Sequence, residues 1–179
     1  MKKLSALVAL LILAVLPVHA KDITIEKLAS PAYQKKFEEL VKQGYRPIKS
    51  WCAPLPTTPG QSEQAGFSAT FRKVKNTSAW QSRHGLTAET YQAEFDKLIA
   101  KGYMPTDIGS GCINNQVIYC VIFEQLPADA KPWTAAHNLF LEEFDELNKE
   151  ALARGLKLKF KNTCETPIGP VYAAVWQQE

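Results

Sequence analysis

The sequence contains an internal repeat with a period of 53 residues, which limits the chain to folds built of similar units. When the chain is shifted against itself by this distance, Trp80 meets Trp133 and His84 meets His137, without a gap. Self-similarity at one period of this length is the sequence signature of stacked or ring-like repeat units. We therefore expect a domain built of equivalent small units.

A third, weaker copy precedes these two. The segment "YQKKFEELVKQGYRP" (33–47) is similar to "YQAEFDKLIAKGYMP" (91–105), and the offset then changes across the Pro-rich segment 53–66. Such a segment is typical of an exposed loop, where insertions are tolerated. The first copy has "DITIE" in place of the Trp-containing lead-in, as terminal repeats are often atypical. We expect a single domain, 21–179, of three repeats at about 22–76, 77–128 and 129–179.

Each copy carries the pattern of one amphipathic helix. In the second copy Tyr91, Phe95 and Leu98 recur on one helical face, with Thr87 as the expected N-cap and Gly102 as the residue that ends the helix. In the first copy Ser30 is the expected N-cap. The apolar face of the third helix is expected to consist of Phe140, Phe144, Leu147 and Ala151.

Two strands are expected after each helix. In the second copy "YMPTDIG" and "QVIYCVIFE" flank a turn predicted at Asn114–Asn115. One face of the second strand is apolar in all three copies and is expected to pack on the helices. The other face is apolar only in the later copies, so we expect it to be covered there. The predicted fold class is α+β, with three helix-plus-β-hairpin repeats building an antiparallel sheet packed on helices.

The first twenty residues have the pattern of a signal peptide. Lys2 and Lys3 precede the uncharged apolar run Leu4–Val18, which is shorter than the roughly 20 residues of a membrane span. Small residues at Val18 and Ala20 predict cleavage after Ala20. We expect a periplasmic or secreted protein that does not insert into the membrane after cleavage.

The charge balance excludes one class of partner. Outside the predicted leader, which holds two of the 21 basic residues, the basic residues nearly balance the 18 acidic ones. A near-neutral chain offers no electrostatic attraction to nucleic acid or to an anionic membrane. The composition does not predict an oligomeric state.

Four cysteines follow the predicted leader: Cys52, Cys112, Cys120 and Cys164. In an exported protein, an even number predicts two disulfides. A zinc site is disfavoured because no C-x-x-C occurs. The predicted turn places Cys112 and Cys120 about 10 Å apart along the ladder, beyond the reach of a disulfide. The two remaining pairings both join different repeats and stay open.

The pattern W-x-x-R-x-G-L-T-x-x-x-Y-Q-x-x-F-D-x-L-x-x-x-G-Y-x-P, followed by "YAAVW", resembles a bacterial tandem-repeat family. Its repeats occur alone in exported proteins or beside β-lactamase-like serine hydrolases, including fungal polyglycine hydrolases. The resemblance covers the chain after the leader and departs most over 138–158. It implies a repeat architecture, with hydrolase catalysis in a separate domain; this chain has no S-x-x-K motif of that kind.

The recurring Trp-x-x-x-His is the candidate binding feature. Trp80 with Arg83 and His84, and Trp133 with His137, could line equivalent sites, because Trp and Arg are frequent in binding hot spots. The alternative, which we favour, is that each Trp packs at the junction between repeats while its His contacts a backbone carbonyl.

No motif for catalysis, a phosphate or a cofactor is found. The segments "GFSAT" and "IGSGC" do not match G-x-S-x-G, and no Gly-rich phosphate loop occurs. We therefore expect a non-catalytic exported binding module, without cofactor or metal, whose ligand is a protein or polymer of the cell envelope. One alternative is a periplasmic inhibitor or immunity protein against a cell-wall-directed toxin or hydrolase. Another is a hydrolase with an unrecognised site around Cys120 or His84.

Overall fold

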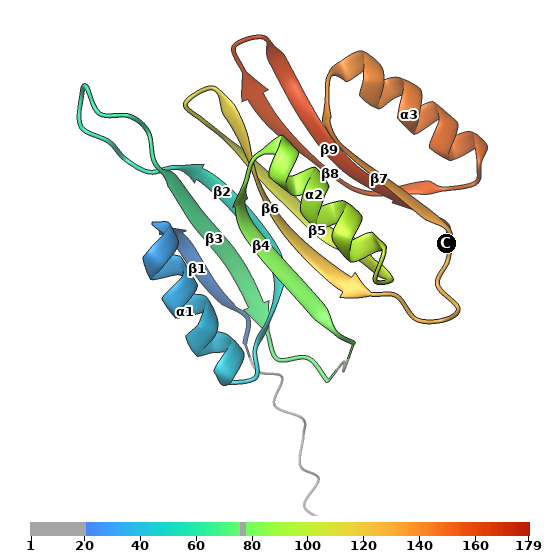
Figure 1. The fold of residues 1–179 in the computed structure, drawn as a ribbon, viewed down its shortest axis with the longest axis horizontal. Coiled ribbons are helices and arrows are strands. Elements are labelled where there is room, and N and C mark those ends of the chain that lie inside the picture. The colour runs from blue at the N-terminus through green and yellow to red at the C-terminus, as the bar shows by residue number, and fades with distance from the viewer. Residues whose placement is uncertain (1–20, 76–77) are drawn as a thin grey trace, which may run out of the picture.

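A computed structural model describes residues 21–75 and 78–179 (Figure 1). The predicted signal peptide, residues 1–20, lies outside the described residues. The chain forms three units, each running strand–helix–strand–strand. The first contains β1 (Ile23–Leu28), α1 (Ser30–Lys42), β2 (Arg46–Pro54) and β3 (Ala65–Arg72). The second contains β4 (Trp80–Leu86), α2 (Ala88–Ile99), β5 (Tyr103–Ile113) and β6 (Gln116–Gln125). The third contains β7 (Trp133–Leu139), α3 (Leu141–Ala153), β8 (Lys157–Thr166) and β9 (Gly169–Gln177).

The α+β class is confirmed, and the structure adds two features to it. The lead-in segment of each repeat is a strand, which pairs with the second strand of the hairpin. The strands therefore form three separate antiparallel sheets, in the orders β1-β3-β2, β4-β6-β5 and β7-β9-β8, instead of one sheet. The third strand of each unit lies in the centre of its sheet, and the other two strands are its edges.

The helix boundaries follow the sequence signals with two exceptions. The Thr87 side chain caps α2 in a capping box with Thr90, as predicted for Thr87. Ser30 is not the N-cap of α1, because the helix begins one residue earlier with Ala29 in that position. Phe140 is not part of the buried face of α3; it is the N-cap residue and is 42% exposed.

The hairpin predicted in the second repeat is confirmed. Asn114 and Asn115 have φ angles of 49° and 61°, the left-handed conformation that a tight hairpin turn requires. Cys112 lies opposite Val117 in the ladder, and Cys120 lies opposite Gly109. This register is the one predicted from the sequence, in which Cys112 and Cys120 are too far apart along the ladder to form a disulfide.

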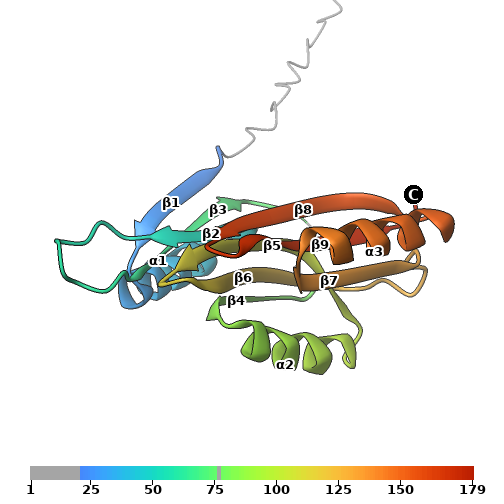
Figure 2. The same cartoon turned by 90° about the horizontal axis from the view of Figure 1, so that it is seen from above.

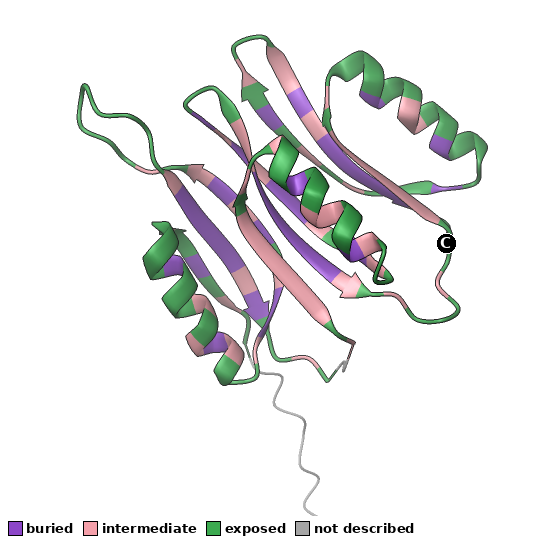
Figure 3. Ribbon diagram, viewed as in Figure 1, coloured by how far each residue is buried: buried purple, intermediate pink, exposed green. Residues whose placement is uncertain are grey.

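Both faces of the central strands are buried (Figure 3). Tyr119, Val121 and Phe123 of β6 pack with α2, as expected for the helix-facing side. On the other side, Cys120 belongs to the apolar core of the first repeat, and Val175 of β9 belongs to the core of the second. Each later repeat is therefore covered by the repeat before it, which confirms the expectation that this face is covered.

Two glycines allow neighbouring sheets to come into backbone contact. A Cβ on Gly109 would lie 2.0 Å from the Ser50 carbonyl oxygen, and a Cβ on Gly111 would lie 2.3 Å from that of Cys52. Strand β2 therefore rests directly on β5. The Ser50 N–H also donates to Asp107 Oδ2 at 2.7 Å. Figure 2 shows β2 and β5 in the middle of the molecule, with β8 on one side of them and α2 outside the strands on the opposite side.

Candidate functional site

The first repeat junction is built by the lead-in strand of the second repeat. Trp80 of β4 packs against Phe37 of α1, with ring centroids 6.1 Å apart. The ring of His84 lies 4.8 Å from that of Tyr33 and 4.7 Å from that of Phe67. The β4 aromatics thus complete the core of the first repeat.

The second junction repeats this arrangement. Trp133 of β7 lies 6.3 Å from Phe95 of α2, and His137 lies 4.2 Å from Tyr91 and 5.4 Å from Tyr119. The Nε2 atom of His137 is 3.2 Å from the Ala88 carbonyl oxygen, to which it donates when it carries the proton. At the first junction, the Nε2 atom of His84 instead lies 3.1 Å from the Ser30 hydroxyl.

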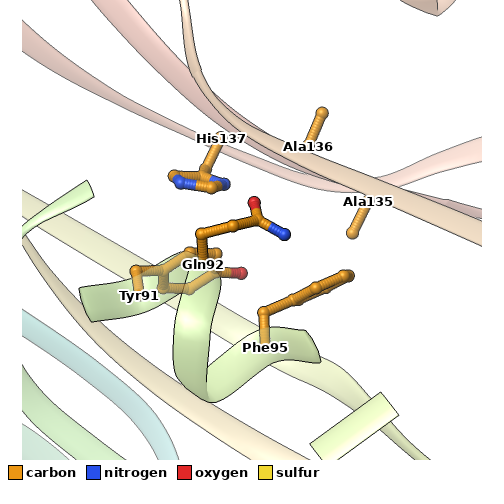
Figure 4. A pocket seen from close by; sticks show the side chains of 6 residues that line it. All are labelled: Tyr91, Gln92, Phe95, Ala135, Ala136 and His137. Carbon is orange, nitrogen blue, oxygen red and sulfur yellow. The ribbon is translucent and has the colours of Figure 1, made fainter. Parts of the chain in front are cut away.

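A small hollow opens beside His137 (Figure 4). Its lining comes from α2 and β7: Tyr91, Gln92, Phe95, Ala135, Ala136 and His137. The volume is about 210 Å³, below the roughly 300 Å³ at which small-molecule pockets begin. Packing between the aromatic rings is sufficient to explain where each ring lies. A binding role for these residues stays a prediction.

Arg83 lies on the opposite side of β4 from Trp80 and His84, because side chains alternate along a strand. Its Nε donates to Glu94 Oε2 of α2 at 2.9 Å, and Lys97 contacts the other oxygen of Glu94 at 2.8 Å. The hydrogen bond from Lys97 and the contact with Arg83 lower the pKa of Glu94. Arg83 therefore joins β4 to its own helix and does not share a site with the Trp and His.

The surroundings of both junction histidines favour the neutral imidazole over the charged one. Burial lowers the pKa of His84, and it lowers the pKa of His137 although the Ala88 carbonyl acts in the opposite direction. Burial also raises the pKa of Tyr119 to about 12. Each junction is an apolar environment, and desolvation there disfavours the charged form of each group.

One disulfide joins two repeats. Cys112 of β5 is bonded to Cys164 of β8, with a Cα–Cα distance of 5.8 Å. This is one of the inter-repeat pairings that the sequence left open. Cys52 and Cys120 are buried and carry free thiols, so the structure holds one of the two disulfides that were expected.

The third repeat differs from the first two at the surface where a lead-in strand packs in those repeats. Lys161 of β8 places its Nζ 5.0 Å from the centroid of Phe144 and 5.3 Å from that of Tyr172, the ring pair equivalent to those under His84 and His137. Asn148 stands where the other helices have Phe37 and Phe95, and its Oδ1 accepts a hydrogen bond from Trp176 Nε1 at 2.9 Å. We call Lys161 and Asn148 the polar cap of the third repeat, because they make these contacts where the first two repeats receive the lead-in strand of the next repeat.

The hairpin tips point to the same side of the molecule (Figure 1). We call this region the tip edge and define it as loop 55–64, the turn Asn114–Asn115 and the turn 166–168. The Asn114 N–H donates to Glu63 Oε2 at 2.8 Å, and the Asn114 side-chain amide donates to the Glu63 carbonyl oxygen at 2.8 Å. The Pro-rich loop is therefore fastened to the second repeat.

A second hollow lies at the tip edge, between the second and third repeats. Its volume is about 510 Å³, and its apolar lining is Val117, Phe140, Pro167, Ile168 and Val171. Ile168 is 79% exposed, the highest exposure among the large apolar side chains of the described residues. This site was not predicted from the sequence. The available signal was an isoleucine inside the turn "TPIG", because turns are exposed and an apolar side chain is not expected there.

Within 21–75 and 78–179, no helix is long and apolar enough to cross a bilayer. The same residues include no group of three or more His, Cys, Asp or Glu placed to hold a metal ion.

The fold and junctions define a tandem-repeat protein in which β4 and β7 each complete the core of the preceding unit. The chain belongs to the family described as "Polyglycine hydrolase-like, structural repeat", whose sequence profile matches residues 24–49, 77–126 and 130–179. A comparison with curated proteins found no match.

Proposed function

We propose that the chain is an exported, non-catalytic interaction module that binds a protein or polymer of the cell envelope at its tip edge. The observation that carries this proposal is the exposed Ile168 beside an apolar hollow. Exposed apolar side chains gathered around a concavity are typical of binding surfaces, whereas singly scattered ones are not. Phe140 adds an exposed aromatic ring to the same hollow, and aromatic residues are enriched among binding anchors.

The scaffold beneath the tip edge supports this role. The disulfide between Cys112 and Cys164 lies close to the turns of the two hairpins that flank the hollow. The contact between Glu63 and Asn114 fastens the third element of the edge. A surface held in one arrangement before binding loses less conformational entropy when a ligand arrives.

The export part of the proposal rests on the sequence. The charged start, apolar run and small residues of 1–20 have the order of a signal peptide. The family resemblance supports it as well, because repeats of this kind occur in exported proteins. The inter-repeat disulfide suits an oxidising compartment.

A capture experiment with matched variants tests the proposal. Full-length protein, purified after expression from Met1, is immobilised and exposed separately to envelope extract and to purified cell-wall polymer. Ile168→Asp adds a charge to the hollow, and Leu152→Asp adds one to an exposed apolar position on α3, as the control. We expect Ile168→Asp to reduce the retained ligand at least tenfold and Leu152→Asp to retain it.

If Ile168→Asp retained as much ligand as Leu152→Asp, the tip edge would not be the binding surface. A retained partner that proves to be a wall-directed hydrolase, bound one to one and inhibited, would identify the inhibitor form of the function. Circular dichroism and an intact Cys112–Cys164 disulfide show that each variant is folded.

A further inference from the structure

Two buried thiols of different repeats meet at the first junction. Cys52 of β2 is 4% exposed and Cys120 of β6 is 1% exposed, and both belong to the apolar core of the first repeat. The Cys52 thiol is close enough to Cys120 to be the largest influence on the pKa of that thiol. The Cys52 thiol also donates to the carbonyl oxygen of Ile118, two positions before Cys120, at 3.0 Å.

The backbone geometry explains why these side chains meet. Cys120 is paired across the ladder with Gly109, and the backbone of β2 rests on β5 at Gly109 and Gly111. Because neither glycine carries a side chain, β2 comes close enough to the β5–β6 hairpin for Cys52 to reach the core position of Cys120.

We propose that Cys52 and Cys120 form an oxidisable dithiol that closes to a second inter-repeat disulfide, joining the first repeat to the second. The thiolate of one cysteine attacks a sulfur of an external disulfide, such as oxidised glutathione or the disulfide of an oxidoreductase, and releases one thiol. The other cysteine then displaces the second external thiol from the mixed disulfide. The protein loses two protons and two electrons, and the external disulfide is reduced to two thiols.

The second bond complements the first. Cys112–Cys164 joins the second repeat to the third, and Cys52–Cys120 joins the first repeat to the second. All three repeats are then cross-linked in series, and neither junction can open fully without breaking a covalent bond.

The environment of the pair predicts when the bond forms. The neighbouring Cys52 thiol and burial together raise the pKa of the Cys120 thiol well above its ordinary value. Because the thiolate is the attacking species, the folded, reduced protein reacts slowly. Closure takes place during folding, before the junction is packed, or when the junction opens transiently.

Disulfide mapping of refolded full-length protein tests the proposal. The reduced, denatured protein is refolded in a glutathione redox buffer, denatured in the presence of N-ethylmaleimide, digested and mapped by mass spectrometry. We expect peptides linked through Cys52 and Cys120 beside those linked through Cys112 and Cys164, with no alkylated cysteine. Refolded protein in which Cys112–Cys164 is formed while Cys52 and Cys120 are alkylated would overturn the proposal.

Two variants serve as controls. The double variant with Cys112→Ser and Cys164→Ser should still acquire one disulfide, which excludes formation of the second bond by exchange with the first. Cys52→Ser should leave Cys120 as a single alkylated thiol, and its Tm should lie below that of the fully oxidised protein by on the order of 10 °C. Equal Tm values for these two forms would contradict the cross-linking role.

Discussion

Trp133 of the third repeat packs edge-on against Phe95 of the second, with ring centroids 6.3 Å apart. Trp80 and Phe37 make the corresponding contact one repeat earlier, at 6.1 Å. These residues are distant in sequence, yet each pair joins the apolar surfaces of two adjacent repeats. Adjacent repeats therefore stabilise one another, as is usual for stacked repeat units.

The contact between β2 and β5 predicts a large effect of one methyl group. Gly109→Ala places a Cβ 2.0 Å from the Ser50 carbonyl oxygen, so the two strands must separate. We expect the free energy of unfolding to fall by about 3 kcal/mol, at the upper end of the range for overpacked cores. Urea denaturation measures it, with exposed Thr163→Ala on β8 as the control, expected within about 0.5 kcal/mol of the parent. A loss below about 1 kcal/mol for Gly109→Ala would show that the strands are not in contact.

The junction histidines predict a loss of stability in mild acid. Burial lowers the pKa of His84 and His137 in the folded protein. In the unfolded chain both take up protons as the pH falls through about 6.5. The unfolded state then binds more protons, so the free energy of unfolding decreases as the pH decreases below that value. Denaturation at a series of pH values measures the slope, and replacing both residues by Gln should flatten it. An unchanged slope in that double variant would refute the assignment.

Asp107 acts in the opposite sense. Burial is the largest influence on this carboxyl and raises its pKa, although the backbone N–H and hydroxyl of Ser50 both donate to it. Ionisation therefore costs stability once the pH rises above about 4, the ordinary value for Asp. We expect Asp107→Asn, whose amide oxygen can still accept from Ser50, to gain stability relative to the parent as the pH rises from 4 to 7. Parallel denaturation series measure this difference, and a gap that is constant over this range would count against it.

The polar cap of the third repeat predicts a modest effect confined to that end. Lys161 lies over Phe144 and Tyr172 in the place taken elsewhere by a histidine. Lys161→Ala removes this contact, and we expect it to lower the free energy of unfolding by about 1 kcal/mol. Lys159→Ala, at an exposed position of the same strand, is the matched control in the same denaturation assay. Equal effects of the two substitutions would show that the position over the rings has no special role.

The repeat units were predictable because their periodic signals are local. Thr87 and the turn Asn114–Asn115 were identified from residue type, and the helix-facing side of β6 from alternation. The lead-in strands were not predicted as strands. In β4, Trp80 faces α1 while Arg83 reaches Glu94 of α2. Because this strand lies between two helices, its polar and apolar residues do not alternate cleanly.

The features that depend on how repeats are placed were harder to predict. The choice of Cys164 as the partner of Cys112 follows from the neighbouring positions of β5 and β8, which no single repeat encodes. Ser30 was predicted to be the N-cap from its residue type. Its hydroxyl instead contacts His84 of the next repeat, a contact that the sequence of one repeat does not show. The tip-edge hollow was missed because Val117 and Ile168 come from different hairpins.

Trp80 and Trp133 each complete the core of the preceding repeat, and a double-mutant cycle at the second junction tests this arrangement. The free energy of unfolding is measured for the parent, Phe95→Ala, Trp133→Ala and the double variant, with Phe95 and Trp80 of the other junction as the control pair. We expect a coupling energy of about 1 kcal/mol between Phe95 and Trp133. For the control pair we expect a value within about 0.5 kcal/mol of zero. Equal coupling in the two cycles, or none between Phe95 and Trp133, would show that Trp133 does not complete the core of the second repeat.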